Sequence, residues 1–222
     1  MIVLGIETST AVCGVGLFIE NGAEIDRSLV ESHIHSEKLL TLLQEVVAGE
    51  QLSLNDIDAV AVSIGPGSFT GLRIGLSTAK GLCYAIGKPL LAVPTFEAIA
   101  EATRQANPTA GRVLILVDAK KDEYYCGRYE DEESGSVNVR SLTEVLPVSD
   151  SWPNVVIVTD RVDIVKSAAG DAALVLDVHQ FCRASIVARL GYRKALGKEF
   201  ADVGTLEPMY LKDFIVQRAG RS

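Results

Sequence analysis

The first thirty residues, MIVLGIETSTAVCGVGLFIENGAEIDRSLV (residues 1–30), predict three consecutive antiparallel strands. Ile2–Ile6 and Val12–Ile19 are apolar runs separated by a short polar break. Asn21-Gly22 is a strong hairpin signal, because both central positions of that turn need a positive φ. Ala23–Val30 can then return beside the second strand. We therefore expect an α/β fold that opens with a strand meander.

Helices and further strands follow the meander up to residue 106. Leu39, Leu40, Leu43, Val46 and Val47 share one broad face of a helix, and Ser36 would suit its N-cap. The predicted helices are Ser36–Ala48, residues 70–86 and Thr95–Ala106, and the predicted strands are Ile57–Ile64 and Pro89–Val93. The segment Asn107–Gly111 is polar and rich in helix and strand breakers, so it is a good boundary.

The second half repeats the pattern in outline, with strands first and helices after them. Its predicted strands are Val113–Val117, Glu123–Tyr129, Val155–Val158 and Leu174–Leu176, and its predicted helices are Arg161–Ala169 and Phe181–Leu196. Residues 130–135 are acidic and read as a solvated hairpin tip. We expect two domains, residues 1–106 and residues 112–222.

Composition excludes several classes of protein. Hydrophobic residues make up 48% of the 222 residues and charged residues 23%, which is the balance of a chain with a core. The net charge is -8, and the pI is near 5.0. A protein that binds nucleic acid alone is normally basic, because phosphate contacts supply most of its affinity. Residues 1–110 carry 12 acidic and 6 basic side chains, so the first half holds most of the excess acid.

Nothing in the sequence predicts a membrane segment or an export signal. No apolar run approaches the ~18 residues that a membrane helix needs, and the N-terminus reads as a strand. The four cysteines lack CxxC spacing, which argues against a zinc site and against a disulfide framework. We expect a cytoplasmic protein with reduced thiols.

Two turns could hold a phosphate group. Ser63–Gly71 is a glycine-rich turn before a helix, where backbone N–H groups can approach an anion, although it has neither the P-loop nor the GxGxxG pattern. Glu7-Thr8-Ser9-Thr10 ends the first strand and offers a carboxylate and hydroxyl groups. The other interpretation is that both segments only form turns and cap a helix. The residues of this possible vestigial phosphate site are Glu7, Thr8, Ser9, Gly65 and Gly67.

The helix over residues 70–86 has two apolar stripes. Leu72, Leu76, Ala79, Cys83 and Ile86 form one stripe, and Ile74, Thr78, Gly81 and Ala85 form a second stripe of mostly small residues nearly opposite. A helix on one sheet needs only one such stripe. The second cover could be the preceding helix or another protein chain.

The segment GPGSFTGLRIG (residues 65–75) resembles the signature of the TsaB family, formerly YeaZ, of bacterial tRNA threonylcarbamoyladenosine biosynthesis proteins. Four further segments agree with this resemblance: Ile6–Thr10, His35–Leu40, Asp118–Tyr125 and Glu207–Lys212. The resemblance spans nearly the whole chain. It implies an actin-like fold of the sugar-kinase and Hsp70 type (ASKHA), with two related domains, each with a mixed sheet flanked by helices.

The resemblance also implies a function. Family members act as non-catalytic scaffolds that bind and activate the catalytic subunit TsaD and help to recruit the ATPase TsaE for N6-threonylcarbamoylation of adenosine beside the tRNA anticodon. We expect a heterodimer with TsaD, a homodimer when the chain is alone, and contact with tRNA only through the complex. The expected partner interface comprises Ser36, Leu39, Leu40, Leu43, Thr70, Leu72, Arg73, Leu76 and Ala79.

The same resemblance argues against catalysis by this chain. TsaD binds a metal through an HxxxH pair, and by placement Thr95 and Ile99 stand at those two positions here. Neither side chain ligates a transition metal as imidazole does. His33, His35 and His179 lie elsewhere, so we expect no catalytic residue, no metal and no cofactor. The alternative is a stand-alone metallopeptidase or ATP-dependent phosphotransferase of the same fold, and a weaker one is an RNA-binding module with a basic tail at residues 217–222.

Overall fold

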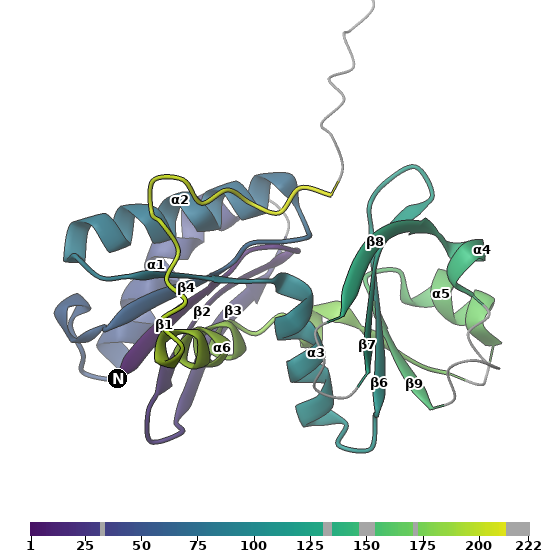
Figure 1. Ribbon diagram of the computed structural model, residues 1–222, viewed down its shortest axis with the longest axis horizontal. Helices are drawn as coiled ribbons and strands as arrows, with labels where there is room; N and C mark the ends of the chain where they lie inside the picture. The colour runs from purple at the N-terminus through teal and green to yellow at the C-terminus, as the bar shows by residue number, and fades with distance from the viewer. Residues whose placement is uncertain (32–33, 131–134, 147–153, 171–172, 212–222) are drawn as a thin grey trace, which may run out of the picture.

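The computed structural model describes residues 1–31, 34–130, 135–146, 154–170 and 173–211. The protein has two lobes, each built on one five-stranded mixed sheet (Figure 1). This arrangement confirms the predicted α/β, actin-like architecture. The division into domains at residues 1–106 and 112–222 stays a prediction. Among the described residues, no helix is both long enough and apolar enough to cross a membrane.

The first sheet has the strand order β3-β2-β1-β4-β5. Its strands are β1 (Ile2–Glu7), β2 (Val12–Ile19), β3 (Glu24–Val30), β4 (Ala59–Ser63) and β5 (Leu90–Val93). The first three strands form the predicted antiparallel meander, and β4 and β5 add in parallel. Parallel neighbours need a crossover, and helices supply it here.

The second sheet has the same order, β8-β7-β6-β9-β10 when read from the opposite edge. Its strands are β6 (Arg112–Asp118), β7 (Glu123–Glu130), β8 (Ser136–Ser141), β9 (Val155–Thr159) and β10 (Leu174–Asp177). Again the first three strands are antiparallel and the last two are parallel. Strand β8 was not predicted from the sequence, because only Val137 and Val139 are apolar in it.

The outer face of the first sheet is covered by two long helices, α1 (His35–Gly49) and α2 (Phe69–Ile86). Leu39 and Val46 of α1 and Leu76 and Cys83 of α2 are buried in one apolar cluster with the sheet. The predicted N-cap at Ser36 is wrong: α1 begins at His35, and Ile34 is its N-cap. The His35 ring reaches inward instead, with its Nε2 atom 3.1 Å from the carbonyl oxygen of Val12.

The inner face of the same sheet carries α6 (Ala184–Leu196), which comes from the end of the chain. Its backbone lies so close to β1 that a Cβ atom at Gly5 would collide with the main chain of Ala184 and Ala188. The rings of Phe18 and Tyr192 also meet, with centroids 5.0 Å apart. A helix from the second half therefore completes the first lobe.

The helix α3 (Thr95–Ala106) links the lobes in the other direction. Phe96 is fully buried, and its ring fills the space above Gly127 of β7. The apolar cluster around α3 and α6 contains side chains of both sheets, so the lobes share one continuous core. Figure 1 shows α3 between the lobes.

The outer face of the second sheet has a thinner cover. It consists of α4 (Leu142–Val145) and α5 (Val162–Ala169), which bury a smaller apolar cluster. Within the described ranges, the other helical elements are the short 3-10 turns η1 (Leu54–Asp56) and η3 (Val178–Gln180).

Candidate functional site

The residues of the possible phosphate site are brought together where β1 and β4 end. The peptide N–H of Ser68, in the glycine turn, donates to the carbonyl oxygen of Ser9 at 2.6 Å. The hydroxyl of Thr8 donates to the carbonyl oxygen of Gly71 at 2.9 Å. The N–H of Gly65 donates to the hydroxyl of Thr95 at 3.0 Å. The turn is thus bonded to its own chain on both sides.

Glycine is needed in this turn because the first hairpin lies directly on it. A Cβ atom at Gly67 would overlap the carbonyl oxygen of Ser9, and one at Gly71 would overlap that of Thr8. The glycines therefore allow a close contact within the chain, in which Thr8 and Ser9 fill the space next to the glycine turn.

Glu7 is the charged member of this cluster, and it is 1% exposed. Its carboxyl group accepts a hydrogen bond from the Ser9 N–H at 2.6 Å and another from the Ser9 hydroxyl. Burial raises the pKa of Glu7, and the bonds from Ser9 act in the opposite direction. The side chain fixes the Thr8–Ser9 turn from within and is shielded from solvent.

A second polar cluster occupies the matching position in the other lobe, where β6 and β9 end. The Asp118 carboxylate is in contact with the Arg161 guanidinium, and it accepts from the Lys120 N–H at 2.7 Å. Asp160 accepts from the Asp118 N–H at 3.0 Å. Burial alone raises the pKa of Asp118, but the hydrogen bonds from Arg161 and Lys120 outweigh it and hold the pKa at about 2. These contacts tie the ends of β6 and β9 together.

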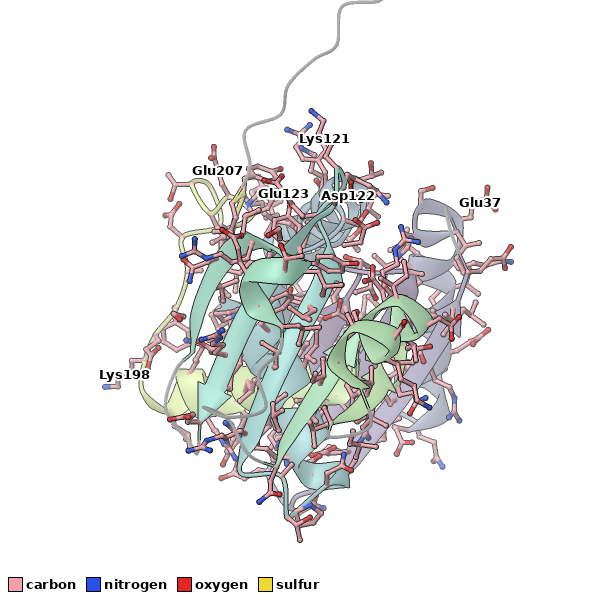
Figure 2. The ribbon with its side chains drawn as sticks, turned by 90° about the vertical axis from the view of Figure 1, so that its right-hand side faces the viewer. Glu37, Lys121, Asp122, Glu123, Lys198 and Glu207 are labelled. Atoms are coloured by element: carbon pink, nitrogen blue, oxygen red, sulfur yellow. The ribbon has the colours of Figure 1, made fainter. Side chains whose placement is uncertain are left out.

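The turn after Asp118 has an unusual backbone. Lys120, Lys121 and Asp122 all have positive φ values, of 65°, 58° and 58°. Non-glycine residues pay roughly 1–2 kcal/mol each for this conformation. The turn points Lys121 and Asp122 outward at the same end of the molecule as Glu37 and Glu207 (Figure 2).

The residues expected at a partner interface divide into two groups. Five are buried in the chain's own core: Leu39, Leu43, Leu72, Leu76 and Ala79. Four are exposed: Ser36, Leu40, Thr70 and Arg73. Leu40 stands out among them, because 61% of it is exposed. Only the exposed four can touch another protein without rearrangement of the fold.

The second apolar stripe of α2 is partly covered by the preceding helix. Ile74 packs against the apolar cluster that contains α1, and Thr78 is half-buried. Gly81 and Ala85 remain exposed, and the neighbouring Tyr84 is 89% exposed. Of the two covers that the sequence allowed, α1 accounts for Ile74, and the end of the stripe is open.

Residues after α6 add a feature that the sequence did not predict. This segment runs from β5 to the start of α2, shown in yellow in Figure 1. Ala201 bonds to Leu90 of β5, and the Met209 N–H donates to the carbonyl oxygen of Ile64 at 2.7 Å. The Arg73 guanidinium donates to the Tyr210 hydroxyl at 3.0 Å and lies 3.9 Å above the Phe69 ring. Sequence analysis singled out Phe69, Arg73 and Tyr210 within two separate motifs, but gave no sign that these motifs lie together.

No group of three or more potential ligands that could hold a metal is found within the described ranges. Thr95 and Ile99, which stand at the expected HxxxH positions, are buried on α3. His179 lies in η3 and contacts Asp177 at 2.8 Å. His33 and the basic tail at residues 217–222 lie outside the described residues, as does Lys212 of the closing motif.

The four cysteines are free and buried. This confirms the expectation of unpaired thiols. Cys182 lies close to Thr10, whose hydroxyl is 3.5 Å from the sulfur atom. Burial raises its pKa well above the usual range, so it is a packing residue in this setting.

Comparison with known proteins gives a consistent picture. The family model described as TsaD, tRNA N6-adenosine threonylcarbamoyltransferase, matches residues 29–141, which is half of the chain. The tRNA threonylcarbamoyladenosine biosynthesis protein TsaB of Escherichia coli is 35% identical over 135 residues, 61% of this chain and 58% of that protein. The TsaB of Haemophilus influenzae is 33% identical over 122 residues, 55% of this chain and 51% of that protein. The chain thus spans little more than half the length of these curated relatives.

Solved structures agree over a longer stretch. YeaZ from Pseudomonas aeruginosa superposes with a TM-score of 0.79 at 27% identity, covering 95% of this chain and 99% of that one. Component A of the (R)-2-hydroxyglutaryl-CoA dehydratase of Acidaminococcus fermentans has a TM-score of 0.56 at 10% identity, covering 88% of this chain and 99% of that one. The second likeness shows the fold alone.

Proposed function

This chain belongs to the TsaB (YeaZ) family, and on that premise we propose that it is a scaffold subunit in the biosynthesis of threonylcarbamoyladenosine in tRNA. Its task is to bind and activate a TsaD-type catalytic subunit, and the pair recruits the ATPase TsaE. The transferred group goes to the N6 atom of adenosine beside the anticodon. tRNA is contacted through the complex, and the chain itself has no catalytic residue.

The observation that carries the proposal is that, in each lobe, the groups at this position that could bind phosphate are engaged by the protein itself. In the first lobe, Thr8 and Ser9 pack directly on Gly71 and Gly67. In the second, Arg161 is engaged by Asp118. An ATP-dependent enzyme of this fold would need such groups free to bind phosphate oxygens. Contacts within the chain that occupy them favour a scaffold.

The binding surface is proposed to be the exposed part of α1 and the start of α2. Leu40 and Arg73 lie on it, and the buried Leu39, Leu72 and Leu76 hold the two helices in place beneath it. An exposed leucine is a good apolar anchor, and arginine is enriched at the energetic centres of interfaces. The same surface is proposed to form the homodimer when TsaD is absent.

Co-purification with tagged TsaD from the same organism tests this surface. Leu40→Asp and Arg73→Glu should each reduce the recovered complex at least tenfold, because each places a charge that opposes the proposed contact. Ile164→Asp is the matched control: Ile164 is 53% exposed but lies on α5 in the other lobe. It should leave recovery unchanged.

Two results would contradict the proposal. Full recovery of the complex with both interface variants, at unchanged thermal midpoints, would show that the surface is wrong. Hydrolysis of Mg-ATP by the isolated chain, with binding in the micromolar range by calorimetry, would show that the chain is an enzyme and overturn the scaffold role.

A further inference from the structure

The second lobe contains a hollow that the proposed scaffold role does not use. It has a volume of about 410 Å³ and lies on β7, β8 and α4, near the β8 edge of the sheet. Figure 1 shows β8 leading into α4. The volume lies within the range of about 300–1,000 Å³ that small-molecule sites have. Its lining residues are Cys126, Arg128, Ser136, Asn138, Arg140, Glu144 and Val145.

The pairing of β7 with β8 explains why these side chains converge. Side chains two apart on a strand share a face, so Ser136, Asn138 and Arg140 form one row on β8. Cys126 lies opposite Asn138 in the register, and Arg128 lies opposite Ser136. The apolar Val137 and Val139 of β8 point to the other face. The polar side chains of β8 therefore all lie on the face of the sheet that carries the hollow.

The two arginines flank the middle of the hollow. Arg140 and Arg128 are set on either side of the Asn138–Cys126 pair, so both long side chains can reach it. Both arginines affect the pKa of the Cys126 thiol. Burial raises this pKa, and Arg128 and Arg140 each lower it. Arg140 also attracts Glu144 of α4 and lowers the pKa of its carboxyl group.

Glu144 is the one acidic side chain of the lining, and it has a structural task. Its carboxylate accepts hydrogen bonds from the Ser141 N–H at 2.8 Å and the Ser141 hydroxyl at 3.0 Å, which caps α4. These bonds lower its pKa. The lining side chains still carry one net positive charge, in a protein whose total is -8.

We propose that this hollow binds a phosphate group carried by a nucleotide-sized ligand. The Arg140 guanidinium matches the geometry of phosphate oxygens through paired hydrogen bonds, and Asn138 and Ser136 add neutral donors beside it. Arg128 adds positive charge to the same lining. The volume suits one nucleotide unit. The phosphate belongs either to a free nucleotide or to one nucleotide of an RNA chain, which present the same group to the arginines.

Calorimetric titration of the full chain at low salt tests the site, with inorganic phosphate, AMP and a ten-nucleotide single-stranded RNA as probes. Arg140→Gln should weaken binding of phosphate and AMP at least tenfold, and added salt should weaken it in the unmodified protein. Arg27→Gln is the control, because Arg27 is exposed on β3 in the other lobe. It should bind like the unmodified chain.

A second variant separates loss of the site from loss of the fold. Asn138→Asp adds a carboxylate to the exposed polar row, where it should abolish phosphate binding and leave the thermal midpoint unchanged. AMP binding as tight as that of the RNA would assign the site to free nucleotides, and RNA binding at least tenfold tighter with the same dependence on Arg140 would assign it to RNA. Absence of millimolar or tighter binding by all three probes, or equal binding by Arg140→Gln and the unmodified protein, would overturn the proposal.

Discussion

The two lobes follow one strand order, yet their outer layers differ greatly in size. In the first lobe α1 and α2 are 15 and 18 residues long, whereas α4 and α5 at the same points of the second lobe have 4 and 8 residues. The long helices cover the outer face of the first sheet. Short helices leave part of the second sheet uncovered, and the hollow at β8 lies there.

The ends of the first strand in each lobe differ in how their carboxyl group is held. Glu7 ends β1 and is sealed, so burial raises its pKa. Asp118 ends β6 at the equivalent position, and Arg161 and Lys120 hold its pKa at about 2 against the effect of burial. The same place in the fold is closed by hydrogen bonds from Ser9 in one lobe and by the ion pair with Arg161 in the other.

The inner layer is what the lobes share, and removing its largest side chain should have the greatest effect. Phe96→Ala should lower the free energy of unfolding by about 3–5 kcal/mol, because it empties space between both sheets. Phe200→Ala is the control and should change it by less than about 0.5 kcal/mol, because Phe200 is 51% exposed. Urea unfolding measures both. Equal losses would mean that α3 does not join the lobes.

The approach of α6 to β1 can be tested next. Gly5→Ala should destabilise the protein by about 2–3 kcal/mol, because the new methyl group meets the main chain of α6. Gly81→Ala should instead stabilise it by about 0.5–1 kcal/mol, since Gly81 lies in α2 with open space around its Cβ position. Opposite signs in urea unfolding would confirm that the first lobe needs a helix from the second half.

Sequence reasoning gave most of the elements but could not place α6. The alternation of apolar runs and the Asn21-Gly22 turn were sufficient for the meander, and helical periodicity was sufficient for α1 and α2. Nothing in residues 184–196 specifies which sheet they cover. The contact depends on the small residues Gly5 and Gly191. Their role can be recognised only once the structure shows that α6 packs on the first sheet.

Sequence analysis grouped the residues of the candidate site correctly, but it did not predict which of the candidate residues are buried and which are exposed. Glu7, Thr8, Ser9, Gly65 and Gly67 do lie together. For the expected interface, an apolar stripe is the same signal whether it faces the core or a partner, so Leu72 and Leu76 could not be separated from Leu40. The hollow at β8 was missed because its arginines lie on two strands and become neighbours only through pairing.

The acid stability of the second lobe should depend on the ion pair that closes it. The native pKa of Asp118 is about 2 against an ordinary value of 3.8, so its contribution is complete above about pH 4 and disappears as the pH falls toward 2. Arg161→Met should therefore destabilise the protein at pH 7 and have almost no effect at pH 2. Arg27→Met should lose little at either pH. A loss that does not change with pH would mean that Arg161 acts through packing.

The smallest expected effect concerns the left-handed turn that follows Asp118. Lys121→Gly should stabilise the protein by about 0.5 kcal/mol, because glycine adopts its φ of 58° without strain and this gain exceeds the added freedom of the unfolded chain. Lys166→Gly in α5 should destabilise it by about 1 kcal/mol, since a helix interior disfavours glycine. Thermal unfolding of both variants gives the signs. If Lys121→Gly also destabilises, the Lys121 side chain makes a contact that offsets its backbone strain, and the turn is held by more than the Asp118 cluster.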